Sequence, residues 1–137
     1  MNKNITFWIL VLIVLVAVTF WLNKTPNEPG RLDVFASCLA QSGAKFYGAF
    51  WCPHCANQKA LFGSSAKLLP YVECSTPDGR SRLQVCTDAG VTGYPTWDFI
   101  TGTTTMRESG EVSLERLSEL SNCPLPAEPS LPTGNDQ

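Results

Sequence analysis

Two cysteines separated by two residues, Cys52 and Cys55, come directly after a short apolar stretch and constrain the fold of this chain most strongly. The stretch 45–51 contains two Phe, one Tyr and one Trp, which is typical of a strand buried on both faces. Residues 57–62 have a helical pattern, and Gly63 is a suitable C-cap. We therefore expect the pair where a buried strand turns into a helix, with Cys52 as the first helical residue.

This position favours redox chemistry. At a helix start, the backbone N–H groups and the positive end of the helix dipole favour the Cys52 thiolate, which is the nucleophile in disulfide exchange. A zinc site would need a second close pair, and Cys74 and Cys86 are too widely spaced. A c-type haem would need His where Ala56 stands. A purely structural bridge is the remaining alternative, although so small a ring contributes little loop entropy. The sequence predicts a redox dithiol, with no metal and no cofactor.

Length, charge and cysteine count narrow the class of protein. The 137 residues allow one domain with appendages. The formal net charge is −2 and the Lys and Arg residues are scattered, so nothing suggests a nucleic-acid partner. Six cysteines are many for so short a chain, and their even number favours an oxidising compartment.

The segment 5–22 is free of charge and is interrupted only by two Thr. At about 1.5 Å per helical residue it would span roughly 27 Å, close to the hydrocarbon thickness of a bilayer. Trp8 and Trp21 lie near its ends, where interfacial aromatics belong. A cleaved signal peptide is the alternative, but 20–24 offers no small-x-small cleavage site. We expect residues 1–22 to be a transmembrane anchor.

The charges on either side of this segment weakly favour an orientation with the N-terminus in the cytoplasm and the globular domain on the extracytoplasmic side, periplasmic or luminal. Residues 23–30 contain two prolines and a glycine and are expected to be a linker. The folded domain is expected over 31–123. Residues 124–137 contain four prolines and no apolar pattern, which predicts a disordered tail.

Between these limits, helical and strand patterns alternate. Apolar residues spaced as on one helix face predict a helix ending at Gly43 and a last helix that begins after an N-cap at Ser113. Turn signals predict a hairpin of 96–100 with 103–108. The elements expected between the first helix and the hairpin are the strand 45–51, the active-site helix, a strand at 70–74 and a short helix at 83–89. Strand–helix–strand order implies a parallel pair, and the hairpin adds antiparallel strands to the same sheet. The pattern predicts an α/β thioredoxin-like fold, a mixed central sheet flanked by helices, with an N-terminal transmembrane helix.

The motif Trp51-Cys-Pro-His-Cys55, with Tyr94-Pro-Thr96 about forty residues later, resembles the thioredoxin superfamily. The dipeptide Pro53-His54 is the one seen in DsbA-type oxidases. Over roughly 32–123 the chain more closely resembles the thioredoxin-like domain that is fused to, or partnered with, bacterial and plant homologues of vitamin K epoxide reductase. The segments that carry this likeness are Gly43 to Cys55, Tyr71 to Gly79 and Tyr94 to Trp97.

That resemblance implies a domain that oxidises cysteine-containing secreted proteins. It also implies reoxidation by a membrane partner like vitamin K epoxide reductase, which would bind the quinone itself. Only one span is expected in this chain, so the four-pass reductase would be a separate partner.

The roles of the site residues follow from position and from the resemblance. Cys52 is expected to attack and Cys55 to resolve the mixed disulfide. His54 can stabilise the Cys52 thiolate and so make the disulfide a stronger oxidant, although a lone exposed His can also be a plain surface residue. Pro53 restricts the helix start at little cost, because its missing N–H has no partner within the helix.

The resemblance assigns Pro95 as a cis-proline that faces the dithiol and leaves the Tyr94 backbone free to pair with an extended substrate. From sequence alone an ordinary trans proline is the alternative. Trp51 is expected to cover one side of the disulfide, and Trp97 to belong to the core.

One position departs from the family pattern. Thioredoxins and related oxidases usually carry a buried acid six residues before the first cysteine, and here that residue is Phe46. A proton relay through that acid is therefore not expected, and Glu73 and Lys45 are the candidates to reach the area instead.

The other four cysteines pair most simply as Cys74 with Cys86 and as Cys38 with Cys123, one choice among fifteen connectivities. The first bridge is expected to be structural. Alternatively, Cys74 and Cys86 form a second redox pair that relays electrons.

The leading interpretation is a membrane-anchored, extracytoplasmic thiol-disulfide oxidase. Two alternatives keep the same fold. One reduces disulfides outside the membrane, and the other is a non-catalytic peptide-binding or chaperone module.

Overall fold

The structure is a computed structural model that describes residues 3–22 and 29–127. Most of the expected linker 23–30 and tail 124–137 lies outside the described residues. The apolar N-terminal segment forms one continuous helix, α1 (Lys3–Leu22). Within the described ranges, none of the helices combines the length and the apolar character needed to cross a membrane.

A four-stranded mixed sheet forms the centre of the domain, in the order β2-β1-β3-β4. The two central strands are β1 and β3, and β1 pairs parallel with β2 and antiparallel with β3. The hairpin β3–β4 completes the sheet, as the turn signals predict. The strands are β1 (Lys45–Gly48), β2 (Tyr71–Glu73), β3 (Thr96–Thr101) and β4 (Thr104–Ser109).

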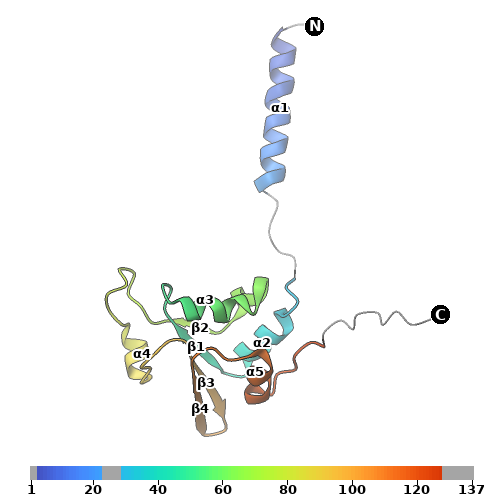
Figure 1. Cartoon of the computed structure of the whole chain (residues 1–137). Coiled ribbons are helices and arrows are strands. Elements are labelled where there is room, and N and C mark those ends of the chain that lie inside the picture. The colour runs from blue at the N-terminus through green and yellow to red at the C-terminus, as the bar shows by residue number, and fades with distance from the viewer. Residues whose placement is uncertain (1–2, 23–28, 128–137) are drawn as a thin grey trace, which may run out of the picture.

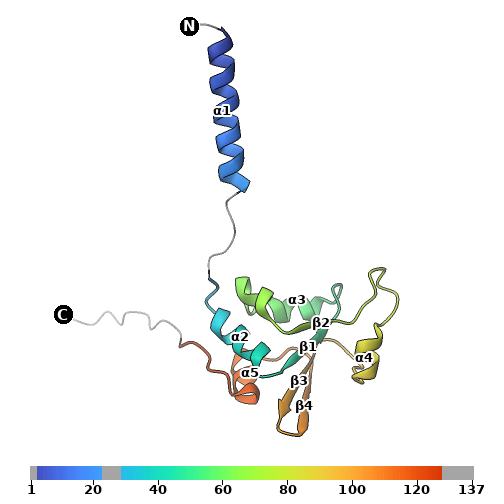
Figure 2. The same cartoon turned by 180° about the vertical axis from the view of Figure 1, so that it is seen from behind.

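Helices surround this sheet in the predicted order. Figures 1 and 2 show α4 on one side of the sheet and both α2 and α5 on the other, and α3 contributes to the same core as α2 and α5. The helices of the domain are α2 (Asp33–Gln41), α3 (Pro53–Ala60), the 3₁₀ helix η1 (Gly63–Leu68), α4 (Gln84–Asp88) and α5 (Leu114–Ser121).

The 3₁₀ helix η1 is the one element that the sequence pattern did not predict. Gly63 has a φ of 53°, which suits the expected helix end, but the chain then continues in a tighter helix. The reason is tertiary: fully buried Ser65 accepts a hydrogen bond of 3.1 Å from the backbone N–H of Leu32, just before α2. This contact fixes η1 against α2.

The central strand β1 has apolar contacts on both faces, as predicted. On one face, Phe46 is fully buried and stacks on Trp97 with the ring centroids 4.7 Å apart. On the other face, Tyr47 packs in a second cluster with Cys74, Cys86 and Val91. The main core lies on the Phe46 side and includes both active-site cysteines.

Candidate active site

The strand that leads to the active site is shorter than predicted. It ends at Gly48, and residues 49–51 form a turn in which Phe50 and Trp51 are 58% and 53% exposed. The prediction that Cys52 is the first helical residue is wrong. Cys52 is the N-cap, with φ −79° and ψ 119°, and Pro53 is the first helical residue. Pro fits there because its absent N–H would have no partner within the helix.

The two active-site cysteines lie side by side in the main core and are not bonded to each other in this structure. Both are buried, with 6% of Cys52 and 2% of Cys55 exposed. The Sγ of Cys52 lies 3.8 Å from the carbonyl oxygen of Tyr94, and the peptide bond between Tyr94 and Pro95 is cis. The structure therefore brings together the residues that the two sequence motifs supplied.

The two thiols differ in their surroundings. Burial and, to a smaller extent, the neighbouring Cys52 raise the pKa of the Cys55 thiol to about 12, while a backbone hydrogen bond from Ala49 and the charge of Lys59 act in the opposite direction. Cys55 is therefore a protonated thiol at neutral pH. It has to lose or gain a proton whenever it takes part in disulfide exchange.

This raised pKa predicts a pH dependence of stability. An unfolded cysteine has its ordinary pKa of 9.0, so above that pH the unfolded chain releases a proton that folded Cys55 still holds. The stability from this thiol is complete below pH 9.0 and is lost as the pH rises through about 12. We expect the melting temperature of the reduced protein to fall more steeply between pH 8 and pH 10.5 than that of the disulfide form, measured by circular dichroism.

The matched control for this measurement is Cys55→Ala, which has no thiol to titrate at this position. Its melting temperature should follow the shallow pH slope of the disulfide form. Equal slopes for the reduced wild type and for Cys55→Ala would contradict the assignment of the raised pKa to Cys55.

His54 does not stand alone at the start of α3, because Glu111 pairs with it. Its Nδ1 lies 2.7 Å from Oε1 of Glu111, and Nδ2 of Asn57 donates to the same oxygen at 3.1 Å. These hydrogen bonds lower the pKa of Glu111, so the carboxylate is ionised and accepts. Nδ1 of His54 is therefore the nitrogen that carries the proton in this contact.

Glu111 was missed in the sequence because it lies 57 residues from His54, in the segment before α5. Its place is set by buried Gln58, whose side chain donates to the carbonyl of Val112 at 2.9 Å and accepts from the N–H of Val112 at 2.7 Å. The N–H of Gly110 also donates to the carbonyl of Pro95 at 2.8 Å. The segment 110–112 is thus fixed to both motifs of the site.

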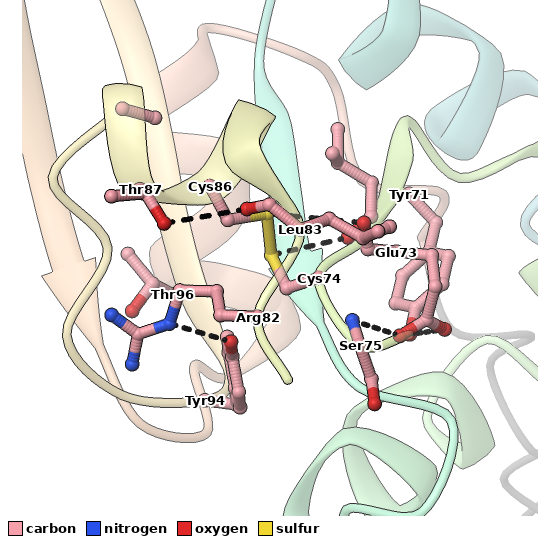
Figure 3. The surroundings of a disulfide bond; sticks show 12 residues. Tyr71, Glu73, Cys74, Ser75, Arg82, Leu83, Cys86, Thr87, Tyr94 and Thr96 are labelled. Atoms are coloured by element: carbon pink, nitrogen blue, oxygen red, sulfur yellow. Dashed lines mark hydrogen bonds between the residues drawn. A yellow bond between two sulfur atoms is a disulfide. The ribbon is translucent and has the colours of Figure 1, made fainter. Parts of the chain in front are cut away.

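Trp51 packs against the polar loop that follows β2. Its Nε1 donates to Oγ of Ser75 at 2.8 Å, and its ring meets that of Tyr94 edge to face at 6.2 Å. Arg82 donates from Nε to the Tyr94 hydroxyl at 3.1 Å (Figure 3). A cavity of about 210 Å³ lies between these groups; its lining residues are Trp51, Cys74, Ser75, Gly79, Arg80, Ser81, Arg82 and Tyr94.

The remaining four cysteines form two disulfides in the expected pairing. Cys74 and Cys86, with Cα atoms 5.6 Å apart, join β2 to α4 (Figure 3). Both are fully buried, so their sulfurs are closed to exchange with another protein, and this supports a structural bridge over an electron relay. Cys38 and Cys123, 5.8 Å apart at Cα, join α2 to the chain after α5.

The position of the missing acid is filled by the buried ring of Phe46. Of the two suggested substitutes, Lys45 lies exposed at the far end of β1, in register with Asp98. Glu73 does reach the active-site turn: it accepts from the N–H of Ser75 at 2.8 Å and from the N–H of Phe50 at 3.3 Å.

A mixed sheet, a C-x-x-C pair at the start of the helix after its central strand, and a cis-proline segment against the first sulfur define a thioredoxin-like redox domain. The chain resembles the thioredoxin superfamily in its fold and in this cysteine pair. It is 47% identical over 90 residues to the thiol-disulfide oxidoreductase LTO1 of Arabidopsis thaliana. This match covers 62% of the chain but only 23% of LTO1, so the chain spans less than a quarter of that relative.

No protein-family model matches the chain. Two solved structures align with a TM-score of 0.41. A structure described as that of a malarial protein is 19% identical and aligns over 58% of this chain and 91% of its own. Oxidised thioredoxin O2 from Arabidopsis thaliana is 20% identical, over 64% of this chain and 84% of its own.

Proposed function

We propose that the chain is a thiol-disulfide oxidoreductase that donates its Cys52–Cys55 disulfide to cysteine-containing secreted proteins. The observation that carries the proposal is the pair of unbonded cysteines at the start of α3, with one sulfur 3.8 Å from the Tyr94 carbonyl. The 47% identity to a thiol-disulfide oxidoreductase over 90 residues supports the same chemistry.

In the proposed reaction a substrate thiolate attacks the Cys52 sulfur of the disulfide. A mixed disulfide forms, and Cys55 leaves as a thiolate that takes up a proton. A second substrate thiolate then attacks the substrate sulfur of the mixed disulfide, and Cys52 leaves. The substrate loses two electrons and gains a disulfide, while the domain is left as the dithiol. A partner oxidant has to accept these two electrons for the next cycle.

Two features support oxidation as the direction. The dipeptide between the two cysteines, Pro53-His54, is the one seen in DsbA-type oxidases. The two structural disulfides in so small a domain fit an oxidising compartment, where substrates gain disulfides.

The reduction potential of the Cys52–Cys55 pair tests the direction. We expect the full-length protein, equilibrated with glutathione buffers, to give a potential of about −120 to −180 mV, as in known oxidants. A potential of about −270 mV, as in thioredoxin, would contradict the oxidase proposal and favour a disulfide reductase. Cys52→Ser is the control: it should show no two-electron transition, because the two buried disulfides do not respond in this range.

We propose in addition that α1 anchors the domain in a membrane, with the globular part on the extracytoplasmic side. The support is the apolar character of α1 on all sides, with Ile9, Leu12 and Ile13 each at least half exposed. The redox proposal does not depend on this anchor. Recovery of the full-length protein in carbonate-washed membranes, with the domain accessible to protease only from the extracytoplasmic side, is the expected result.

The partner that reoxidises the domain follows from the resemblance to domains that work with vitamin K epoxide reductase homologues. We propose a membrane protein of that kind, which binds the quinone while this chain binds none. Exposed Phe50 and Trp51, next to Cys52, offer it an apolar contact at the point where the mixed disulfide would form. Trapping of a Cys55→Ser variant on a single membrane protein would identify it.

A further inference from the structure

The buried thiol of Cys55 needs a partner for its proton, and the usual acid is absent. Cys55 holds its proton at neutral pH, yet it has to leave as a thiolate or attack as one in each catalytic cycle. Phe46 stands where relatives carry a carboxylate, and its ring cannot accept a proton. Another group near the sulfur has to serve this step, and the described surroundings of Cys55 contain one.

Tyr71 approaches Cys55 across the space left open by Gly48. A Cβ placed on Gly48 would lie 2.9 Å from the Cys55 Sγ, 2.8 Å from Cε2 of Tyr71 and 3.3 Å from the Tyr71 hydroxyl. The Cys55 sulfur and the Tyr71 hydroxyl oxygen lie 2.9 Å and 3.3 Å from the same Cβ position, so the distance between these two atoms is at most about 6 Å. A single water molecule is enough to connect two groups at such a distance. Because any side chain at position 48 would collide with both residues, the glycine allows the Cys55 thiol and the Tyr71 phenol to approach this closely.

Tyr71 is in turn hydrogen-bonded to a carboxylate. Its hydroxyl donates to Oε2 of Glu73 at 2.9 Å (Figure 3). The other carboxylate oxygen accepts from Ser75 and Phe50, so backbone N–H groups of the active-site turn and of the following loop hold Glu73 in place. Burial and this carboxylate both raise the pKa of Tyr71, so the phenol keeps its proton and passes it only in exchange for another.

A positive charge lies over the same ring. Nζ of Lys59 is 3.3 Å from the centroid of Tyr71, and its charge lowers the pKa of Cys55. Lys59 is one turn after Cys55 on α3, so it offsets part of the cost of a thiolate in this buried position. Four neighbouring groups therefore lie together here: the Cys55 thiol, the Tyr71 phenol, the Glu73 carboxylate and the Lys59 ammonium.

We propose that Tyr71 and Glu73 relay the proton of Cys55, in place of the buried acid that the sequence lacks. The inference rests on the proposed oxidoreductase function and adds to it the route of the proton. When Cys55 leaves as a thiolate, it takes a proton through the Tyr71 hydroxyl, and Tyr71 regains one that reaches it from solvent water through the Glu73 carboxylate. In the reverse step Cys55 gives its proton to the same path and Glu73 passes it to solvent water, so no proton is lost or created.

Reaction of the reduced full-length protein with Ellman's reagent isolates this step. The Cys52 thiolate attacks the reagent and releases a first thionitrobenzoate. Cys55 then loses its proton and attacks the Cys52 sulfur, which forms the Cys52–Cys55 disulfide and releases a second thionitrobenzoate. The two releases are followed by stopped-flow absorbance between pH 6 and pH 10, in the wild type and in Tyr71→Phe and Glu73→Gln variants.

We expect the second release to be about 10-fold or more slower in Tyr71→Phe at pH 7, since general acid–base assistance contributes on this order or above. The deficit should shrink towards pH 10, where hydroxide removes the proton directly. The first release should stay within about twofold of the wild type. Glu73→Gln should reproduce this pH-dependent deficit, and it serves as the second variant if Tyr71→Phe does not fold.

The matched control is Tyr47→Phe, which removes a hydroxyl from the neighbouring strand on the opposite face of the sheet. It should leave both releases unchanged. A second release in Tyr71→Phe and Glu73→Gln that equals the wild type, or that is slowed by the same factor at every pH, would overturn the relay. Absence of a second release in the wild type would be a different result, because it would refute the redox function itself.

Discussion

Cys52→Ser is expected to remove the oxidoreductase activity completely, to the uncatalysed rate. A serine hydroxyl forms no disulfide, so neither the mixed disulfide nor the electron transfer can occur. The fold should remain, because oxygen is close in size to sulfur and the thiol makes only a long contact of 3.8 Å with Tyr94. The measurement is the oxidative refolding of a reduced secreted protein, with the melting temperature as a check on folding.

Cys55→Ser is the matched comparison for this variant. It cannot form the Cys52–Cys55 disulfide, so it should also lack oxidase activity towards a reduced substrate. Its Cys52 thiolate can still attack a disulfide of an oxidised protein, and without Cys55 the resulting mixed disulfide should accumulate until a reductant releases it. Residual activity in Cys52→Ser would refute the dithiol mechanism. Activity independent of both cysteines would favour the alternative of a peptide-binding or chaperone module.

The second large effect concerns stability. Replacing Cys38 and Cys123 together by serine opens a bridge between residues 85 positions apart. The chain-entropy model gives a loss of about 4.5 kcal/mol for a loop of this size. For a domain of this length that corresponds to a fall in melting temperature of about 20 °C or more. Denaturant unfolding, with the active-site pair kept reduced in both proteins, measures the difference.

The double serine variant of Cys74 and Cys86 provides the comparison, since it opens a loop with a sequence separation of only 12. The same model gives a smaller loss, about 3 kcal/mol. Both variants should keep activity under conditions in which they remain folded. Loss of activity in a folded variant without Cys74 and Cys86 would contradict the structural role and revive the electron relay.

Local patterns predicted the framework of this domain. The spacing of apolar residues predicted α2 and α5, the Ser113 cap predicted where α5 begins, and Thr101-Gly102 predicted the hairpin. Ser113 Oγ does accept the N–H of Arg116 at 3.2 Å. These features depend on neighbours within a few residues, which is the range over which sequence is informative.

The predictions were wrong or incomplete where contacts between residues far apart in the sequence determine the structure. Aromatic residues extended the predicted strand to Trp51, but Phe50 and Trp51 are exposed at the rim of the site and β1 ends at Gly48. The 3₁₀ helix is held by Ser65 against the start of α2, which no local pattern contains. The same holds for Glu111, which meets His54 only because Gln58 is bonded to the backbone of Val112. Tyr71 lies near Cys55 because β2 pairs with β1 and because Gly48 has no side chain to keep the two residues apart.

The bridge between Cys74 and Cys86 closes the base of the polar loop that carries Arg80 and Arg82 into the cavity beside Trp51. A loop closed at its base can change its sequence between the two cysteines without disturbing the strand on one side or the helix on the other. The loop is therefore held independently of the dithiol: the sheet and α3 fix the two active-site cysteines, while the bridge fixes the loop beside them. Exchanging residues 76–82 between related chains is expected to leave the redox chemistry unchanged.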